Sequence, residues 1–219
     1  MARRVFFSFH YGRDVWRVNQ VRHSWVTKPD REAAGFFDAA EQEEIKRTTN
    51  EKIRRWIDQQ MQNTSVTVVL IGSKTAEREW VHYEIHKSVE RGNGIVGIRI
   101  NSLKDRHGNT DFEGSNPLKK FVVEDDGRVR TLSSIYSTYD WEWDNGRKNM
   151  GTWVEEAAQT SDILSDEACL SVRPRESFLE GVNWEAGAGF LAGAGALYYI
   201  QKYTDVDLLK NIDLSQFKR

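Results

Sequence analysis

The sequence predicts an α/β protein with a doubly wound parallel sheet and helices on both faces. Strand-like and helix-like segments alternate from residue 5 to residue 101, as they do where each helix crosses from one parallel strand to the next. The segments "SVTVVLIGS" (65–73) and "GIVGIRIN" (94–101) are apolar without a polar alternation. The run over 65–73 indicates a strand that is buried on both faces, as in a parallel sheet.

The first two elements are a buried strand over 5–10 ("VFFSFH") and a helix that follows the turn over 11–13. Apolar and aromatic residues bounded by a Gly-containing turn are typical of a strand. Asp14 is expected to be the N-cap of the helix, because its carboxylate can accept a free backbone N–H. The apolar stripe of this helix is formed by Val15, Val18, Val21 and Trp25.

A second strand is expected over 34–39 ("AGFFDA") and a second helix over 48–61. Thr48 and Glu51 have the spacing of a capping box, which marks a helix start. The apolar stripe of this second helix is formed by Ile53, Trp56, Ile57 and Met61.

The remaining elements follow the same alternation. The strand over 65–73 leads to a helix over about 76–91 and a strand over 94–101. Residues 102–130 are polar and are expected to be rich in loops. Residues 131–157 return to an aromatic pattern, which predicts a last strand and helix.

The composition changes near residue 158, so we expect a domain of residues 1–157 and an extension of residues 158–219. The extension begins like a linker and is rich in Gly and Ala over 178–203. Ala186–Ile200 holds fifteen uncharged residues, whereas a membrane-spanning helix needs ~20. The favoured interpretation is a helical segment that is buried or self-associating. A membrane-associating segment and a Gly-rich phosphate loop are the less favoured alternatives.

The bulk composition is that of a globular protein, with 39% hydrophobic and 29% charged residues. The formal net charge of -2 gives no basic field that would recruit nucleic acid. Cys169 is the one cysteine and cannot form an intrachain disulfide. With no signal-peptide pattern at the N-terminus, these features favour a cytoplasmic location and no membrane partner.

His82 and His86 share one helix face at a four-residue spacing that can hold a metal. The segment reads H-Y-E-I-H rather than H-E-x-x-H, and no third ligand is evident. We therefore expect two surface histidines and no metal site.

Trp80 and Glu84 are also four residues apart, to one side of the apolar stripe of their helix. In a doubly wound sheet, ligands bind at the carboxyl ends of the strands. The candidate loops there are His10–Asp14, Asp38–Glu44 and Gly72–Glu79. An indole and a carboxylate at this edge could stack a base and stabilise a cation. On spacing alone, a solvated surface glutamate is the favoured interpretation.

Several ordered motifs resemble the TIR-like domain family, and within it the TIR proteins of Thoeris antiphage defence systems. They are "RVFFSFHYGRD" (4–14), "GFFDA" (35–39) and "NTSVTVVLIGSKTAEREWVHYEI" (63–85). Later segments, "NPL" (116–118) and "LSSIYSTYDW" (132–141), are similar to that family as well. The resemblance covers about residues 1–155.

The resemblance implies a flavodoxin-like fold and an NAD substrate, with no separate cofactor. Family members cleave the nicotinamide–ribose bond and can cyclise the ADP-ribose product. By motif position, Glu84 corresponds to the catalytic glutamate and Trp80 to the tryptophan before it. The implied substrate-binding residues are Phe6, Ser8, Phe9, His10, Tyr11, Asp38, Ser73, Trp80 and Tyr83. Loop position alone suggests that Gly12 and Arg13 approach the pyrophosphate.

The resemblance also implies a role in antiphage defence. The cyclic product would be a signal that activates a partner effector, and the effector would deplete NAD. We expect self-association as well. Two other interpretations stay open: a non-catalytic TIR-like module for interaction or nucleotide sensing, and an N-glycosidase that acts on nucleosides.

Overall fold

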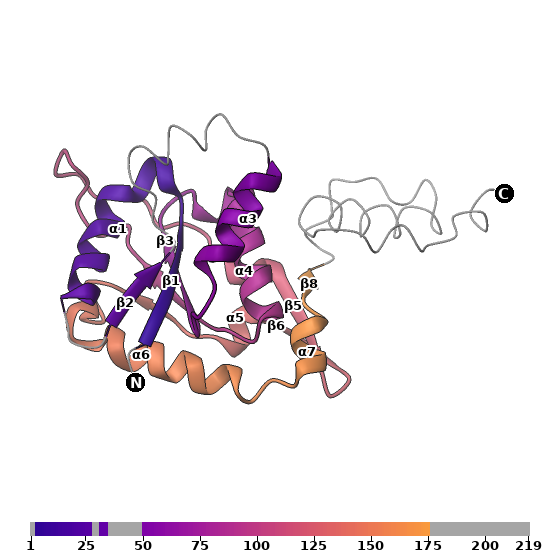
Figure 1. Ribbon diagram of the computed structural model, residues 1–219. Coiled ribbons are helices and arrows are strands. Elements are labelled where there is room, and N and C mark those ends of the chain that lie inside the picture. The colour runs from indigo at the N-terminus through magenta and orange to yellow at the C-terminus, as the bar shows by residue number, and fades with distance from the viewer. Residues whose placement is uncertain (1–2, 28–30, 35–49, 176–219) are drawn as a thin grey trace. The chain divides into compact units, whose positions relative to one another are not determined.

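The computed structural model describes residues 3–27, 31–34 and 50–175, and a parallel sheet forms its centre (Figure 1). Within these residues the strand order is β2-β1-β3-β4-β7, and each neighbouring pair is parallel. The strands are β1 (Arg3–Phe9), β2 (Arg31–Ala34), β3 (Val66–Ile71), β4 (Gly94–Arg99) and β7 (Thr138–Asp140). This is the strand order of flavodoxin-like sheets, so the predicted doubly wound fold is confirmed.

Helices cover both faces of this sheet (Figure 1). On one face, α1 (Tyr11–Val26) and α6 (Gly146–Ser161) share a hydrophobic core with the strands. On the other face lie α3 (Asn50–Gln60) and α4 (Glu79–Glu90). The helices expected over 48–61 and 76–91 are thus confirmed where the structure describes them, apart from a short 3-10 turn, η1 (Thr75–Glu77), before α4.

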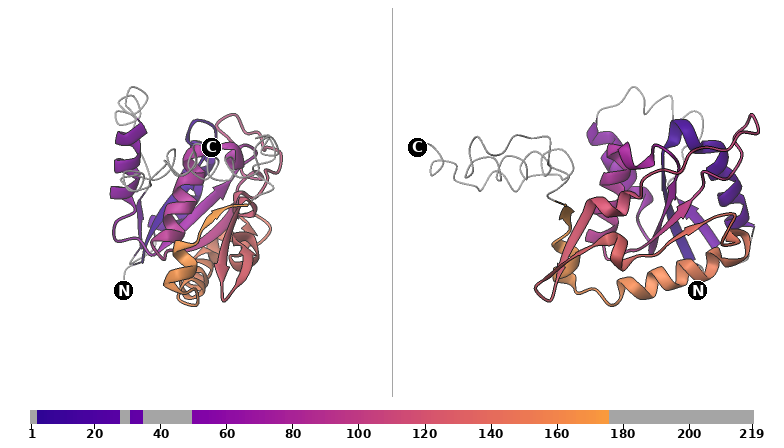
Figure 2. Two further views of the ribbon diagram at one scale, coloured as in Figure 1. Left: turned by 90° about the vertical axis from the view of Figure 1, so that its right-hand side faces the viewer. Right: turned by 180° about the vertical axis from the view of Figure 1, so that it is seen from behind.

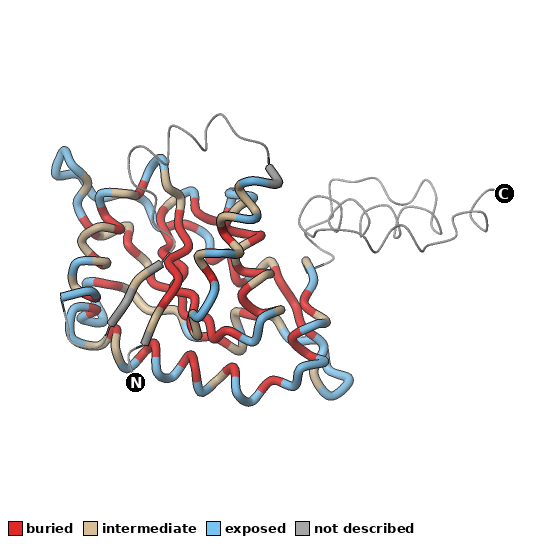
Figure 3. The backbone as a smooth tube through the Cα atoms, viewed as in Figure 1, coloured by how far each residue is buried: buried red, intermediate tan, exposed pale blue. Residues whose placement is uncertain are grey.

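The central strands are buried along their length, which explains their continuous apolar sequence (Figure 3). All six residues of β3 are buried, because β1 and β4 flank it and helices cover both of its faces. Side chains of β1 alternate between the faces. Phe7 and Phe9 point into the core beneath α1 and α6, whereas Ser8 points toward α4.

A small second sheet, in the order β6-β5-β8, lies beside α4 and away from α1 (Figures 1 and 2). Its elements and their short neighbours are η2 (Pro117–Lys120), β5 (Phe121–Asp125), β6 (Arg128–Thr131), α5 (Leu132–Ile135), α7 (Asp166–Leu170) and β8 (Arg173–Pro174). The expectation of loops over 102–130 is therefore wrong for residues 117–130. Val123 and Phe121 are buried there, and the Phe121 ring meets that of His82 in α4 edge to face.

Residues 158–173 do not form the expected linker. Helix α6 continues to Ser161, and α7 follows with Ala168 and Cys169 buried. The first compact unit of the chain extends to Arg173, and the second comprises residues 174–219. The Gly/Ala-rich segment over 178–203 lies outside the described residues.

Two further local expectations differ from the structure. His10, not Asp14, is the N-cap of α1, and Asp14 lies within the helix as a fully buried residue. Strand β2 ends at Ala34, and the rest of the strand expected over 34–39 lies outside the described residues. In the described part of the chain, every helix is too short or too polar to cross a membrane.

The contact between β4 and α6 gives a test of this architecture. A Cβ atom on Gly94 would lie 2.1 Å from the Ala157 carbonyl oxygen, which is backbone and cannot move aside without shifting α6. Gly94→Ala should lower the free energy of unfolding by about 1–3 kcal/mol in urea titrations. Gly12→Ala is the control, because a Cβ there meets no atom closer than 3.9 Å. An unchanged stability of Gly94→Ala would contradict this packing.

Candidate active site

The candidate site is centred on a contact between the end of β1 and the middle of α4. The Ser8 hydroxyl donates a 2.6 Å hydrogen bond to Oε2 of Glu84. Ser8 is fully buried, and its partner in the neighbouring strand is Val69 near the carboxyl end of β3. The pair therefore lies at the ligand-binding edge, between the two strands where a sheet of this order changes direction.

A second polar contact fixes the position of α4 along the direction of the strands. Thr67 of β3 and Ser88 of α4 are both fully buried, and their hydroxyl oxygens are 2.6 Å apart. The Ser88 hydroxyl also donates a 2.6 Å hydrogen bond to the backbone carbonyl of Glu84. Glu84 lies one helical turn from Ser88, so this anchor positions its side chain at the end of β1.

Trp80 and Tyr83 form the aromatic part of the site. Their rings meet edge to face with centroids 6.1 Å apart. Tyr83 is buried, and its hydroxyl donates a 3.0 Å hydrogen bond to Asp58 of α3. Trp80 is half-buried and lies one turn before Glu84. Trp80 thus has an exposed portion that a ligand can contact, while Tyr83 braces it against α3.

Burial changes the acid–base behaviour of Glu84. Loss of solvation raises the pKa of its carboxyl group from 4.5 to about 8, and the hydrogen bond from Ser8 opposes part of this rise. Glu84 is only partly buried as a residue, so a ligand at the edge of the sheet can reach it. A cation close to the carboxyl group would favour its ionised form.

The other residues implied at the end of β1 divide between the two faces. Phe6 is fully buried two residues before Ser8, and Phe9 packs toward α1 with its ring 5.5 Å from that of Tyr11. His10 follows the strand as a half-buried residue. Burial, then the charge of Arg78, lowers the pKa of His10, which favours its neutral form.

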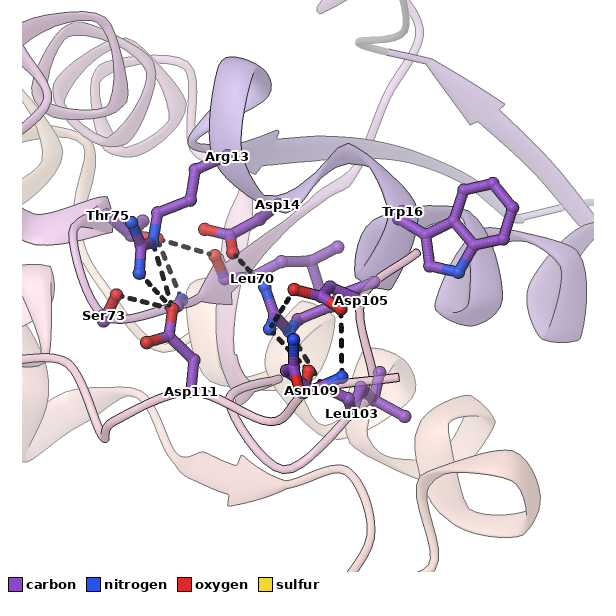
Figure 4. A network of polar contacts seen from close by, with 12 residues as sticks. Arg13, Asp14, Trp16, Leu70, Ser73, Thr75, Leu103, Asp105, Asn109 and Asp111 are labelled. Atoms are coloured by element: carbon purple, nitrogen blue, oxygen red, sulfur yellow. Dashed lines mark hydrogen bonds and ion pairs between the residues drawn. The ribbon is translucent and has the colours of Figure 1, made fainter. Parts of the chain in front are cut away.

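Sequence analysis did not identify Asp111, which joins two of the candidate loops (Figure 4). Its Oδ2 atom accepts hydrogen bonds from Ser73 at 2.8 Å and from Arg13 at 3.0 and 2.8 Å. No local pattern in the polar segment 102–116 distinguishes Asp111 from its neighbours. Asp38, the remaining implied residue, lies outside the described residues.

His82 and His86 are buried, so the expectation of two surface histidines is wrong. The Nε2 atom of His82 lies 2.8 Å from the Ala76 carbonyl oxygen, and its ring meets Phe121 edge to face. The second sheet and the segment containing α7 cover this part of α4. In the part of the chain that the structure describes, no three His, Cys, Asp or Glu side chains are grouped to hold a metal ion.

The raised pKa of Glu84 predicts a pH-dependent stability. Its folded pKa is above its unfolded value, so folding takes up a proton between about pH 4.5 and 8. Stability therefore falls as the pH rises through this window. In urea titrations, the free energy of unfolding of Glu84→Gln should rise by at least about 1 kcal/mol relative to that of the parent as the pH increases from 5 to 8.

The control for this titration is Glu113→Gln, which removes an exposed carboxylate that pairs with Arg99. This variant should not reproduce the gain of Glu84→Gln. A difference between Glu84→Gln and the parent that is independent of pH would show that the carboxyl group is not desolvated.

Comparisons with known proteins agree with this fold. Residues 6–105, which include Ser8 and Glu84, match the family described as Thoeris protein ThsB, TIR-like domain. The chain is similar to a Bacillus cereus (strain MSX-D12) protein named "Putative cyclic ADP-D-ribose synthase ThsB1". The two are 42% identical over a 192-residue alignment, and the match covers 70% of this chain and 100% of that relative. The chain therefore belongs to the TIR-like domain family of the Thoeris ThsB proteins.

Proposed function

We propose that this protein cleaves the nicotinamide–ribose bond of NAD and joins the ends of the remaining ADP-ribose into a cyclic product. The observation that carries the proposal is the desolvated Glu84 carboxyl group, bonded to the buried Ser8 hydroxyl at the ligand-binding edge. The name of the Bacillus cereus relative, "Putative cyclic ADP-D-ribose synthase ThsB1", supports the same reaction.

The chemistry requires one well-placed carboxylate. When the bond between ribose C1′ and the pyridinium nitrogen breaks, its electron pair goes to the nitrogen, and nicotinamide leaves as a neutral molecule. The ribose then has oxocarbenium character. The Glu84 carboxylate stabilises that charge, or accepts hydrogen bonds from the ribose hydroxyls. Because the leaving group is already a good one, a second carboxyl group acting as a general acid is not required.

The high pKa of Glu84 suits this substrate. In the free protein at pH 7 the carboxyl group is largely protonated, since its pKa is about 8. The pyridinium ring of NAD is a cation, and its arrival favours ionisation of Glu84. Ser8 keeps the ionised carboxylate in place through its hydrogen bond. A poorly solvated carboxylate interacts more strongly with the developing cation than one in water does.

Cyclisation rather than hydrolysis depends on which nucleophile reaches C1′ first. A site that excludes water allows a nucleophile of the ADP-ribose itself to form the new bond. Phe6 and Ser8 are fully buried, and Trp80, one helical turn before Glu84, packs edge to face against Tyr83. These residues are the part of the described structure that would limit water around the reacting ribose.

The biological role proposed for the product is that of a signal in antiphage defence. It would activate a separate effector that depletes NAD, in a cytoplasmic pathway. The family membership supports this role. The alternative, a non-catalytic module for interaction or nucleotide sensing, would have no need for a desolvated carboxyl group beside Trp80.

The reaction is tested by the release of nicotinamide from NAD, followed by chromatography, with purified protein and in extracts of phage-infected cells that express it. Glu84→Gln keeps the size of the side chain but removes its charge, so it should lower the rate at least ~100-fold. Ser8→Ala should give a smaller loss, about tenfold, because the carboxylate remains but is less well positioned.

The control is Glu90→Gln, which changes the same charge on the same helix and should retain the activity of the parent. Nicotinamide release by Glu84→Gln at the rate of the parent would refute the catalytic role of Glu84. Absence of NAD cleavage in the infected extracts as well would favour the non-catalytic module.

A further inference from the structure

The carboxylate of Asp111 occupies a converging set of hydrogen-bond donors (Figure 4). Arg13 donates from Nε and Nη2, at 3.0 and 2.8 Å, and the Ser73 hydroxyl donates at 2.8 Å. All three bonds end on one oxygen atom, Oδ2. The Asp111 side chain is only 9% exposed, while that of Arg13 is 45% exposed.

This donor set is suited to a phosphate group. A guanidinium that presents two N–H groups to one anion, with a hydroxyl beside it, is a common arrangement around phosphate oxygens. Arg13 lies in the first turn of α1, directly after β1, and Ser73 lies two residues after β3. These are the two strands of the switch point, where sheets of this order bind nucleotides.

The segment over 101–116 that contains Asp111 is held by contacts that do not involve the Asp111 side chain. The buried Arg17 donates to the carbonyl oxygens of Leu103 at 2.8 Å and of Asn109 at 3.0 Å. The Asp111 backbone N–H donates to the Asn101 carbonyl oxygen at 2.8 Å. The Asp111 carboxylate can therefore leave Arg13 by rotating its side chain while the backbone stays in place, although this rotation also breaks the 2.9 Å hydrogen bond that Oδ1 accepts from the Phe112 N–H.

The far end of the same segment is fixed as well. Arg99 donates a 2.9 Å hydrogen bond to the Gly114 carbonyl oxygen. A Cβ atom on Gly114 would lie 2.0 Å from the Gly72 carbonyl oxygen, so the two backbones are in direct contact. This contact keeps the segment close to Ser73, whatever the Asp111 side chain does.

We propose that Arg13 and Ser73 form a diphosphate-binding subsite, and that the Asp111 carboxylate occupies it in the free protein and is displaced by the substrate. The inference rests on the proposed function, since it assigns this subsite to the diphosphate of NAD. Asp111 thus acts as an internal competitor that a diphosphate must replace.

The charge of Asp111 determines whether its side chain favours or opposes the binding of a diphosphate. Burial alone would raise the pKa of Asp111, but the hydrogen bonds from Ser73, Arg13 and the Phe112 backbone outweigh it, and the pKa is lowered. Asp111 is therefore an anion at neutral pH and repels an incoming diphosphate. An asparagine at this position keeps an acceptor oxygen for Arg13 but removes the repulsion.

The test is the direct binding of inorganic pyrophosphate, measured by titration calorimetry, so that it does not depend on NAD cleavage. Asp111→Asn should bind pyrophosphate about three- to tenfold more tightly than the parent. Adding Arg13→Gln to this variant should abolish the gain. In the parent background, Arg13→Gln and Ser73→Ala should each weaken binding at least ~threefold.

The matched control is Glu113→Gln, which removes an exposed carboxylate from the same segment. Glu113 pairs with Arg99 at 2.8 Å rather than with Arg13, so pyrophosphate binding should change less than about twofold. This variant shows whether tighter pyrophosphate binding comes from freeing Arg13 or only from removing a negative charge from the segment.

Pyrophosphate binding by Asp111→Asn that is equal to or weaker than that of the parent would overturn the proposal and assign Asp111 a purely structural role. Pyrophosphate binding that neither Arg13→Gln nor Ser73→Ala changes would also overturn the proposal. This second test can be made even if Asp111→Asn fails to fold. If the predicted affinities are found and NAD is not cleaved, the subsite stands and the proposed reaction fails.

Discussion

The hydrogen bond between Ser8 and Glu84 is the interaction on which the rest of the site depends. It joins the end of β1 to α4 and holds a carboxyl group where little water reaches it. The Thr67–Ser88 contact, one helical turn away, fixes α4 against β3 so that Glu84 can reach Ser8. A small shift of α4 along the sheet would separate the carboxyl group from the serine and from the edge where a ligand binds.

In the proposed function, the two sides of the switch point would bind different parts of a dinucleotide. On the α4 face, Glu84, Ser8 and Trp80 would surround the nicotinamide ribose. At the start of α1, Arg13 donates to the same Asp111 oxygen atom as Ser73, and the segment over 101–116 packs across both loops. Proximity of a carboxylate to the ribose and of a guanidinium to the diphosphate is consistent with the charges of NAD, which is cationic at one end and anionic in the middle.

The sheet and its helices could be predicted because local patterns carry them: the apolar runs of β3 and β4 and the stripe of α1. The catalytic role of Glu84 could not be predicted from its spacing from Trp80, which alone favours a surface residue. Only the ordered family motifs indicated catalysis. Asp111 could not be predicted, because it meets Arg13 across 98 positions of sequence. The burial of His82 and His86 was mispredicted for a similar reason, since the covering second sheet and α7 come from residues 117–174.

If the desolvated Glu84 carboxyl group drives the proposed NAD cleavage, its ionisation should appear in the pH dependence of kcat/KM for nicotinamide release. This quantity reports the ionisation of groups in the free enzyme. If the ionised carboxylate is the active form, kcat/KM should rise with pH and level off above an apparent pKa of about 8. A profile that is flat from pH 6 to pH 9 would contradict the account.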